Sequence, residues 1–246
     1  MTESPWFRRW FGEDYLHLYP HRDQEEAEDA VALLLARVPL QEDSSVLDLA
    51  CGPGRHLQAL ASRGIHAFGL DLSFPLLRKA TQAAPRCPLV RGDMRTLPFR
   101  DDTFHLVTSF FTSFGYFDTE GEDRDVLAEI RRILRPGGHL LLDYLNAEWV
   151  RSTLTPRDSR EVGGREVVQV RRLVEGGRAV EKEIVIQDAE GLGTKNFRER
   201  VRLYEAQELE ALMADQGLEP LERLGDYHGG PTAPDAPRVI VLARAG

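Results

Sequence analysis

Short apolar segments alternate with amphipathic segments along most of this chain, and no other feature limits its possible folds as strongly. The spacing predicts strands at 44–50, 65–71, 88–93, 104–111 and 139–146, and helices at 24–37, 54–64, 73–84 and 123–134. Parallel strands are joined by helical crossovers, which cover both faces of the sheet. We therefore expect an α/β fold with a mostly parallel sheet of about seven strands.

At about residue 150 the hydrophobic period changes from helical to two, which indicates an antiparallel meander. Its expected strands are 165–174, 178–188 and 197–205, after which a helix at 206–217 and strands at 218–227 and 238–245 return to the first pattern. Residues 1–150 and 205–246 are thus predicted to form one core domain. Residues 151–204 are predicted to be an inserted antiparallel β-layer, a lid or a dimerisation subdomain. Arg198, Arg200 and Arg202 alternate in its last strand and would either meet an anionic substrate or face solvent.

Composition excludes several classes of protein. The net charge of −9 disfavours nucleic acid as a partner, and the apolar runs are far shorter than a membrane helix needs. Cys51 and Cys87 are too few for a disulfide framework or a metal cluster, so we expect no metal and a cytoplasmic protein.

The first predicted strand leads into a glycine-rich turn, Ala50-Cys51-Gly52-Pro53-Gly54, and then into a helix. Such a turn either is a tight connection or lets the backbone approach a ligand at the helix N-terminus. A dinucleotide site would have a third glycine where Leu57 stands. Asp48, just before the turn, would repel a pyrophosphate and suits a cationic ligand, which favours S-adenosylmethionine over NAD.

Two further acids stand at the ends of the next two strands. Asp71 can accept hydrogen bonds from a ribose diol, and Asp93 can accept one from an adenine amino group, with Met94 as an apolar surface for the ring. The carboxyl ends of parallel strands share one edge of a sheet, where open α/β sheets bind their ligands. The three acids together therefore predict one nucleotide-type site.

Four segments, VLDLACGPGRH, FGLDLS, RGDMRTLPF and LRPGGHLLLDYLN, together resemble the class I S-adenosylmethionine-dependent methyltransferases, which have a Rossmann-like fold. The resemblance covers about residues 15–150 and 206–245. Residues 112–117 and the opening segment from Tyr15 to Asp23 look like a bacterial small-molecule subgroup with a β insertion after the fifth strand. Ala50 departs from the family pattern, which has glycine there.

The resemblance implies roles for ten residues. Asp48, Ala50 and Gly52 would border the methionine half of the cofactor, and Tyr15 and Arg22 would close over its tail. Asp71 would bind the ribose, Leu72 would pack beside the adenine, Asp93 and Met94 would fix it, and the carbonyl of Phe110 would face the cofactor's amino group.

The expected activity is in-line transfer of a methyl group from S-adenosylmethionine to an unidentified small-molecule acceptor. An NAD-binding oxidoreductase and an S-adenosylmethionine-binding module without turnover remain alternatives. Tyr19, Tyr116, Tyr144 and His228 are candidates to contact the acceptor or to act as a general base. A homodimer is also a possibility, and no membrane partner is expected.

Overall fold

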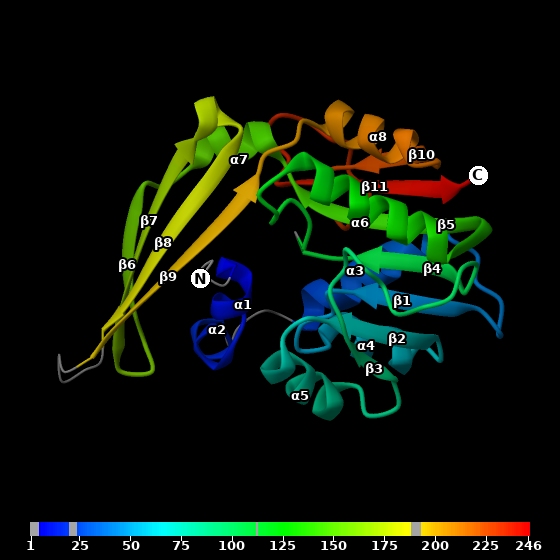
Figure 1. Ribbon diagram of the computed structural model, residues 1–246, viewed down its shortest axis with the longest axis horizontal. Coiled ribbons are helices and arrows are strands. Elements are labelled where there is room, and N and C mark those ends of the chain that lie inside the picture. The colour runs from blue at the N-terminus through cyan, green and yellow to red at the C-terminus, as the bar shows by residue number, and fades with distance from the viewer. Residues whose placement is uncertain (1–4, 20–23, 112, 188–192) are drawn as a thin grey trace.

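The computed structural model describes residues 5–19, 24–111, 113–187 and 193–246. A seven-stranded sheet with helices on both faces stands beside a separate four-stranded sheet (Figure 1). The order of the large sheet is β10-β11-β5-β4-β1-β2-β3, and β11 is antiparallel to both of its neighbours. The predicted fold class is confirmed. The strands of this sheet are β1 (Ser45–Leu49), β2 (His66–Asp71), β3 (Leu89–Arg91), β4 (Phe104–Ser109), β5 (Leu134–Leu145), β10 (Leu218–Leu224) and β11 (Arg238–Ala245).

Five helices cover the large sheet because each has an apolar face to bury. They are α3 (Gln24–Arg37), α4 (Arg55–Ser62), α5 (Phe74–Ala83), α6 (Glu120–Ile133) and α8 (Ala206–Asp215). Buried residues of α6 and α8 form one apolar core with the sheet, and buried residues of α3, α4 and α5 form a second. None of the helices in the described ranges is long and apolar enough to cross a membrane.

Most elements differ from their predicted bounds by a few residues, and β5 begins at Leu134 rather than 139. Two of the differences have clear local reasons. Helix α6 begins at Glu120 rather than 123, because Thr119 and Glu122 form a capping box at its N-terminus. Strand β4 ends at Ser109 rather than 111, because Phe111 turns into the left-handed region at φ 59°. The chain therefore leaves the sheet two residues early, at the edge where the predicted acids lie.

The insertion contains more structure than its period-two pattern predicted. A short helix, α7 (Ala147–Thr153), leads to four strands rather than three, with a 3₁₀ turn, η1 (Glu175–Gly177), between β7 and β8. The strands are β6 (Arg157–Val162), β7 (Arg165–Val174), β8 (Ala179–Gln187) and β9 (Thr194–Arg202).

The N-terminal helices α1 (Trp6–Trp10) and α2 (Glu13–Leu18) lie between the two sheets (Figure 1). Trp10, Tyr15 and Leu18 share an apolar cluster with Val167 and Ile184 of the insertion. The aromatic N-terminus thus covers one face of the small sheet.

A buried carboxylate joins the insertion to the core domain. Asp123, on α6, is fully buried, accepts a 2.8 Å hydrogen bond from Tyr204 Oη and lies 3.3 Å from Arg202 Nε. In addition, the backbone N–H of Arg202 donates to the carbonyl of Gly115 at 2.8 Å. The C-terminal end of β9 is therefore held against the loop that follows β4.

We expect Asp123→Ala to lower the free energy of unfolding by about 3–5 kcal/mol, because it leaves the largely buried Arg202 guanidinium without its counter-charge. Urea denaturation measures this change. Asp215→Ala is the matched control, because it also removes an aspartate that pairs with an arginine, but in an exposed pair. The urea midpoint of this variant should therefore change little. Similar midpoints for both variants would contradict the anchoring role.

Candidate functional site

The three predicted acids meet at the carboxyl edge of neighbouring strands. Asp71 ends β2, Asp48 is the second-last residue of β1, and Asp93 follows β3 by two residues. In the parallel register, Asp48 lies opposite Gly69, and Asp71 lies opposite Arg91. The expected placement at one edge of the sheet is observed, whereas the role of these acids in binding a nucleotide stays a prediction.

The Asp71 carboxylate organises the first two turns of this edge. It accepts hydrogen bonds from the backbone N–H of Gly52 at 2.9 Å and of Ser73 at 2.7 Å. Burial raises the pKa of Asp71, although these N–H groups act in the opposite direction. The carboxylate, with about four acceptor sites, keeps at least one lone pair that a ligand hydroxyl can use.

The turn after β1 has the backbone conformation that a close ligand requires. Gly54 has φ +87°, and a Cβ there would come within 2.9 Å of the Ala80 backbone. Gly52 has φ +56°, but a Cβ there would meet nothing within 4 Å, so space is open beside it. Ala50 is also left-handed at φ 57°, where glycine would be relaxed; alanine bears a strain of roughly 1 kcal/mol in this region.

Asp48 is enclosed beneath the turn and is not among the residues that line the cavity described below. Its Oδ1 lies 3.4 Å from the Thr108 hydroxyl, and its Oδ2 has no hydrogen-bond partner among the described residues. Burial, reinforced by nearby Asp71, raises the pKa of Asp48 to about 8. The Arg55 charge acts in the opposite direction but does not offset this rise, so without a bound cationic ligand the carboxyl is protonated at neutral pH.

Asp93 has a strong partner already. Arg95 donates to both of its oxygens, at 3.0 and 2.7 Å, and this pairing lowers the pKa of Asp93. The same guanidinium reaches Glu122 and lies 4.6 Å from the centre of the Phe117 ring. Asp93 is thus a fixed, ionised acceptor.

A cavity of about 490 Å³ runs from these strand ends to the insertion. Five segments of chain, Leu145 of β5 and three insertion residues form its walls. The lining residues used below are Phe11 and Tyr15; Ala50 and Gly52; Asp71 and Leu72; Asp93 and Met94; Phe110, Phe111 and Tyr116; and Lys182, Glu199 and Val201.

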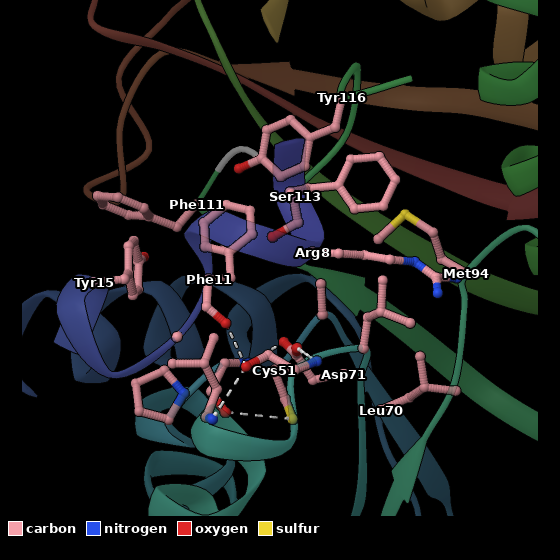
Figure 2. A pocket seen from close by; sticks show the side chains of 18 of the residues that line it. Arg8, Phe11, Tyr15, Cys51, Leu70, Asp71, Met94, Phe111, Ser113 and Tyr116 are labelled. Carbon is pink, nitrogen blue, oxygen red and sulfur yellow. Dashed lines mark hydrogen bonds between the residues drawn. The ribbon is translucent and has the colours of Figure 1, made fainter. Parts of the chain in front are cut away.

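Aromatic side chains form the wall opposite the strand ends. Figure 2 shows the rings of Phe11, Phe111 and Tyr116 across the cavity from Asp71. Phe11 and Tyr116 are stacked, with ring centroids 5.6 Å apart, and Phe11 lies 5.0 Å from Tyr15. The Ser73 hydroxyl donates to the carbonyl of Phe11 at 2.6 Å and so fastens this N-terminal segment to the start of α5.

The insertion supplies a charged pair to the far wall of the cavity. Lys182 of β8 and Glu199 of β9 are directly opposite in register and form an ion pair. Burial alone would lower the pKa of Lys182, but Glu199 and the Tyr19 hydroxyl outweigh it, and the net pKa is raised. Lys182 is therefore an enclosed ammonium group.

The structure brings most of the predicted site residues together at one cavity. Tyr15, Ala50, Gly52, Asp71, Leu72, Asp93, Met94, Phe110 and Tyr116 line it. Tyr19 is not among the lining residues, but its hydroxyl lies 3.4 Å from Lys182 Nζ. Arg22 lies outside the described residues.

Three sequence interpretations are corrected. Tyr144 is fully buried and donates to the carbonyl of Arg202, so it reaches no acceptor. His228 lines a separate, shallower cavity beside α3, because its loop is folded around the Asp226 carboxylate. On β9, Glu199 and Val201 face the main cavity, whereas Arg200 and Arg202 bind the carbonyls of Phe117 and Asp118. The alternating arginines therefore form neither a substrate face nor a fully solvated one.

Sequence reasoning missed Phe11, Phe111, Lys182 and Glu199. The aromatic N-terminus was visible, but no pattern showed which wall it would form. One signal was available for Lys182, because lysine occurs only at positions 79, 182 and 195 in a chain rich in arginine.

Comparison with known proteins identifies the family. Residues 46–138 match the family described as "Methyltransferase domain". The chain is 32% identical to the dTDP-3-amino-3,4,6-trideoxy-alpha-D-glucopyranose N,N-dimethyltransferase of Streptomyces venezuelae, over 84% of this chain and 86% of that enzyme. It is a member of the S-adenosylmethionine-dependent methyltransferases. This methyltransferase is also 29% identical to the dTDP-3-amino-3,6-dideoxy-alpha-D-glucopyranose N,N-dimethyltransferase of Streptomyces fradiae, over 84% of this chain and 78% of that enzyme.

A solved structure supports the same assignment. The methyltransferase superimposes on S-adenosylmethionine-bound CalS10, an amino pentose methyltransferase from Micromonospora echinaspora, with a TM-score of 0.68, 27% identity and complete coverage of both chains. The methyltransferase uses S-adenosylmethionine and transfers its methyl group to a small molecule. The relatives are methyl-transferring enzymes, so neither alternative, the NAD-binding oxidoreductase or the module without turnover, is supported.

The raised pKa of the buried Asp48 leads to a prediction about the stability of the methyltransferase. We expect wild-type protein without ligand to lose stability relative to Asp48→Asn as the pH rises from 5 to 8. In this range the unfolded chain has already released the proton of residue 48, whereas the folded protein keeps it until about pH 8. The difference in the free energy of unfolding between the two proteins should grow by about 1.4 kcal/mol per pH unit at most. Thermal melts of both proteins at each pH measure it, and a pH-independent difference would be inconsistent with a neutral Asp48.

Proposed function

We propose that this methyltransferase methylates the amino group of a small amino sugar. The observation that carries the proposal is the similarity to two sugar N,N-dimethyltransferases, which spans 84% of the chain. A match of this extent includes residues beyond the cofactor-binding half of the chain. The structural match to an amino pentose methyltransferase covers the whole chain and supports the same acceptor class.

The aromatic wall of the cavity suits an amine acceptor. Methylation of an amine gives an ammonium cation, and aromatic faces attract such a cation at close range. Phe11, Tyr15 and Tyr116 present rings on this wall. Their bulk also excludes water, which would otherwise compete with the acceptor.

The residues at the strand ends fit S-adenosylmethionine. Asp71 keeps at least one lone pair for a ribose hydroxyl, and the open space beside Gly52 leaves room for the methionine half. The unpartnered Oδ2 of Asp48 gives a buried acceptor for positive charge below the same turn. On these grounds we propose a set of residues that bind the cofactor. They are Tyr15, Asp48, Ala50, Gly52, Asp71, Leu72, Asp93, Met94 and Phe110.

Bound S-adenosylmethionine supplies an electrophilic methyl group on a positively charged sulfur. Because its leaving group is neutral, the chain needs to align the acceptor and exclude water rather than to activate a leaving group. The fixed Phe11–Ser73 contact and the anchored loop from Gly115 to Asp118 hold the two sides of the cavity in place.

We also propose that the insertion forms the acceptor wall, the side of the cavity that contacts the methyl acceptor. Only Lys182, Glu199 and Val201 of the described insertion residues line the cavity, and all three are remote in sequence from the strand-end acids. A homodimer remains a prediction, as does a cytoplasmic location, which the free, buried thiols of Cys51 and Cys87 suit.

Asp71→Asn should weaken binding of S-adenosylhomocysteine by roughly 10- to 100-fold, because hydrogen bonds to a charged group contribute about 1.5–3 kcal/mol. Titration calorimetry measures the dissociation constant. Asp226→Asn is the matched control, since Asp226 also accepts two backbone N–H bonds at a turn but lies outside the main cavity. Equal affinities in both variants would remove Asp71 from the cofactor site.

The acceptor class is tested with a pair of sugars that differ at one atom. We expect dTDP-3-amino-3,6-dideoxy-α-D-glucose to gain one or two methyl groups, detected by mass spectrometry, and dTDP-6-deoxy-α-D-glucose, with a hydroxyl at the same carbon, to gain none. Methylation of the hydroxyl sugar alone would show an O-methyltransferase and refute the proposal.

A further inference from the structure

The Lys182–Glu199 pair needs an explanation beyond stability. An enclosed ion pair loses the hydration of both charges, and apolar residues of similar size often serve stability equally well. The neighbouring β8–β9 pairs Val180–Val201 and Ile184–Phe197 are apolar, as expected for strands with one covered face. The pair is therefore a charged pair between two apolar pairs of the β8–β9 ladder, and Gln169 and Arg171 of β7 extend the polar contacts on the same face.

The pair is also placed where an acceptor can reach it. Both residues line the main cavity, on the wall that the insertion supplies, whereas the cofactor acids lie at the strand ends. The ammonium of Lys182 has three N–H groups; one is directed to Glu199, and the Tyr19 hydroxyl lies within 3.4 Å of Nζ. A donor thus remains, and the Glu199 carboxylate keeps unused lone pairs.

An adjacent donor and acceptor of this kind match a particular chemical group. A neutral amine donates through its N–H, and a hydroxyl oxygen on the neighbouring carbon accepts. We infer that Lys182 and Glu199 recognise a vicinal amino alcohol: Glu199 accepts a hydrogen bond from the acceptor amine, and Lys182 donates to the hydroxyl beside it. This inference rests on the proposed amino-sugar function and narrows it to sugars with a hydroxyl next to the amine.

Three sugars with the same amine test the inference. The probes are dTDP-3-amino-3,6-dideoxyglucose, the 3,4,6-trideoxy analogue and the 2,3,4,6-tetradeoxy analogue, which have two, one and no hydroxyl groups beside the C3 amine. With saturating S-adenosylmethionine, we expect kcat/KM to fall by at least about tenfold from the first sugar to the last, because an enclosed donor is left unpaired when the hydroxyl is absent.

Lys182→Met should remove this preference: its kcat/KM should fall by about tenfold or more on the first sugar and change little on the last. The matched control is Lys195→Met, which removes an exposed lysine of the same sheet that pairs with Asp14. The double variant Lys182→Met/Glu199→Gln leaves no unpaired buried charge and should show the same flat preference, so a folding defect of the single variant would not mask the result.

The failures of the two proposals are distinguishable. If wild-type enzyme methylates all three sugars equally well, or if both lysine-182 variants keep the wild-type preference, the inference is overturned and the amino-sugar function stands. If the wild-type enzyme methylates none of the three, the proposed function is overturned, and the inference falls with it.

Discussion

The Asp71 carboxylate is the contact on which the site edge depends. It accepts backbone hydrogen bonds from Gly52 and Ser73 and so joins the turns after β1 and β2. Ser73 in turn caps α5 and donates to the carbonyl of Phe11, which holds the aromatic N-terminal segment over the cavity. One buried acid therefore fixes two turns directly and the opposite wall through a single intermediate residue. This short chain of hydrogen bonds joins the strand ends to the aromatic wall of the cavity.

Strain and unfavourable burial gather around the same cavity. Ala50 and Phe111 are both left-handed without being glycine, and both line it. Burial, with the charges of Arg55 and Arg238, lowers the pKa of His56 to about 3, so this ring, stacked on Phe110, is neutral. Such features cost stability and persist where the surrounding structure holds them in place, which is common at functional sites. The well-packed cores on both faces of the large sheet offset that cost.

The sequence was sufficient for the features that depend on local pattern and on the geometry of parallel strands. Period and turn residues predicted the sheet, and strand ends predicted that Asp48, Asp71 and Asp93 would meet. Period two did not show which face of β9 is covered, so the arginines were misplaced: Arg200 and Arg202 have partners more than 70 residues away in the chain. His228 was misplaced for a related reason, since the fold of its loop depends on Asp226 rather than on the adjacent strand.

The strand-end side and the insertion side of the cavity are formed by different kinds of chemical groups. The strand-end side uses backbone N–H groups and carboxylates held by tight turns, so a substitution there changes the turn as well as the ligand contact. The insertion side uses side chains of an antiparallel sheet whose ladder does not depend on them, as the register of β8 and β9 continues on both sides of Lys182 and Glu199. Under the proposed acceptor role, replacement of that pair should change which acceptor is bound while the strand-end side keeps its geometry. In this proposal, the inserted sheet at the carboxyl edge gives the core domain an acceptor wall that can vary independently of the strand-end side.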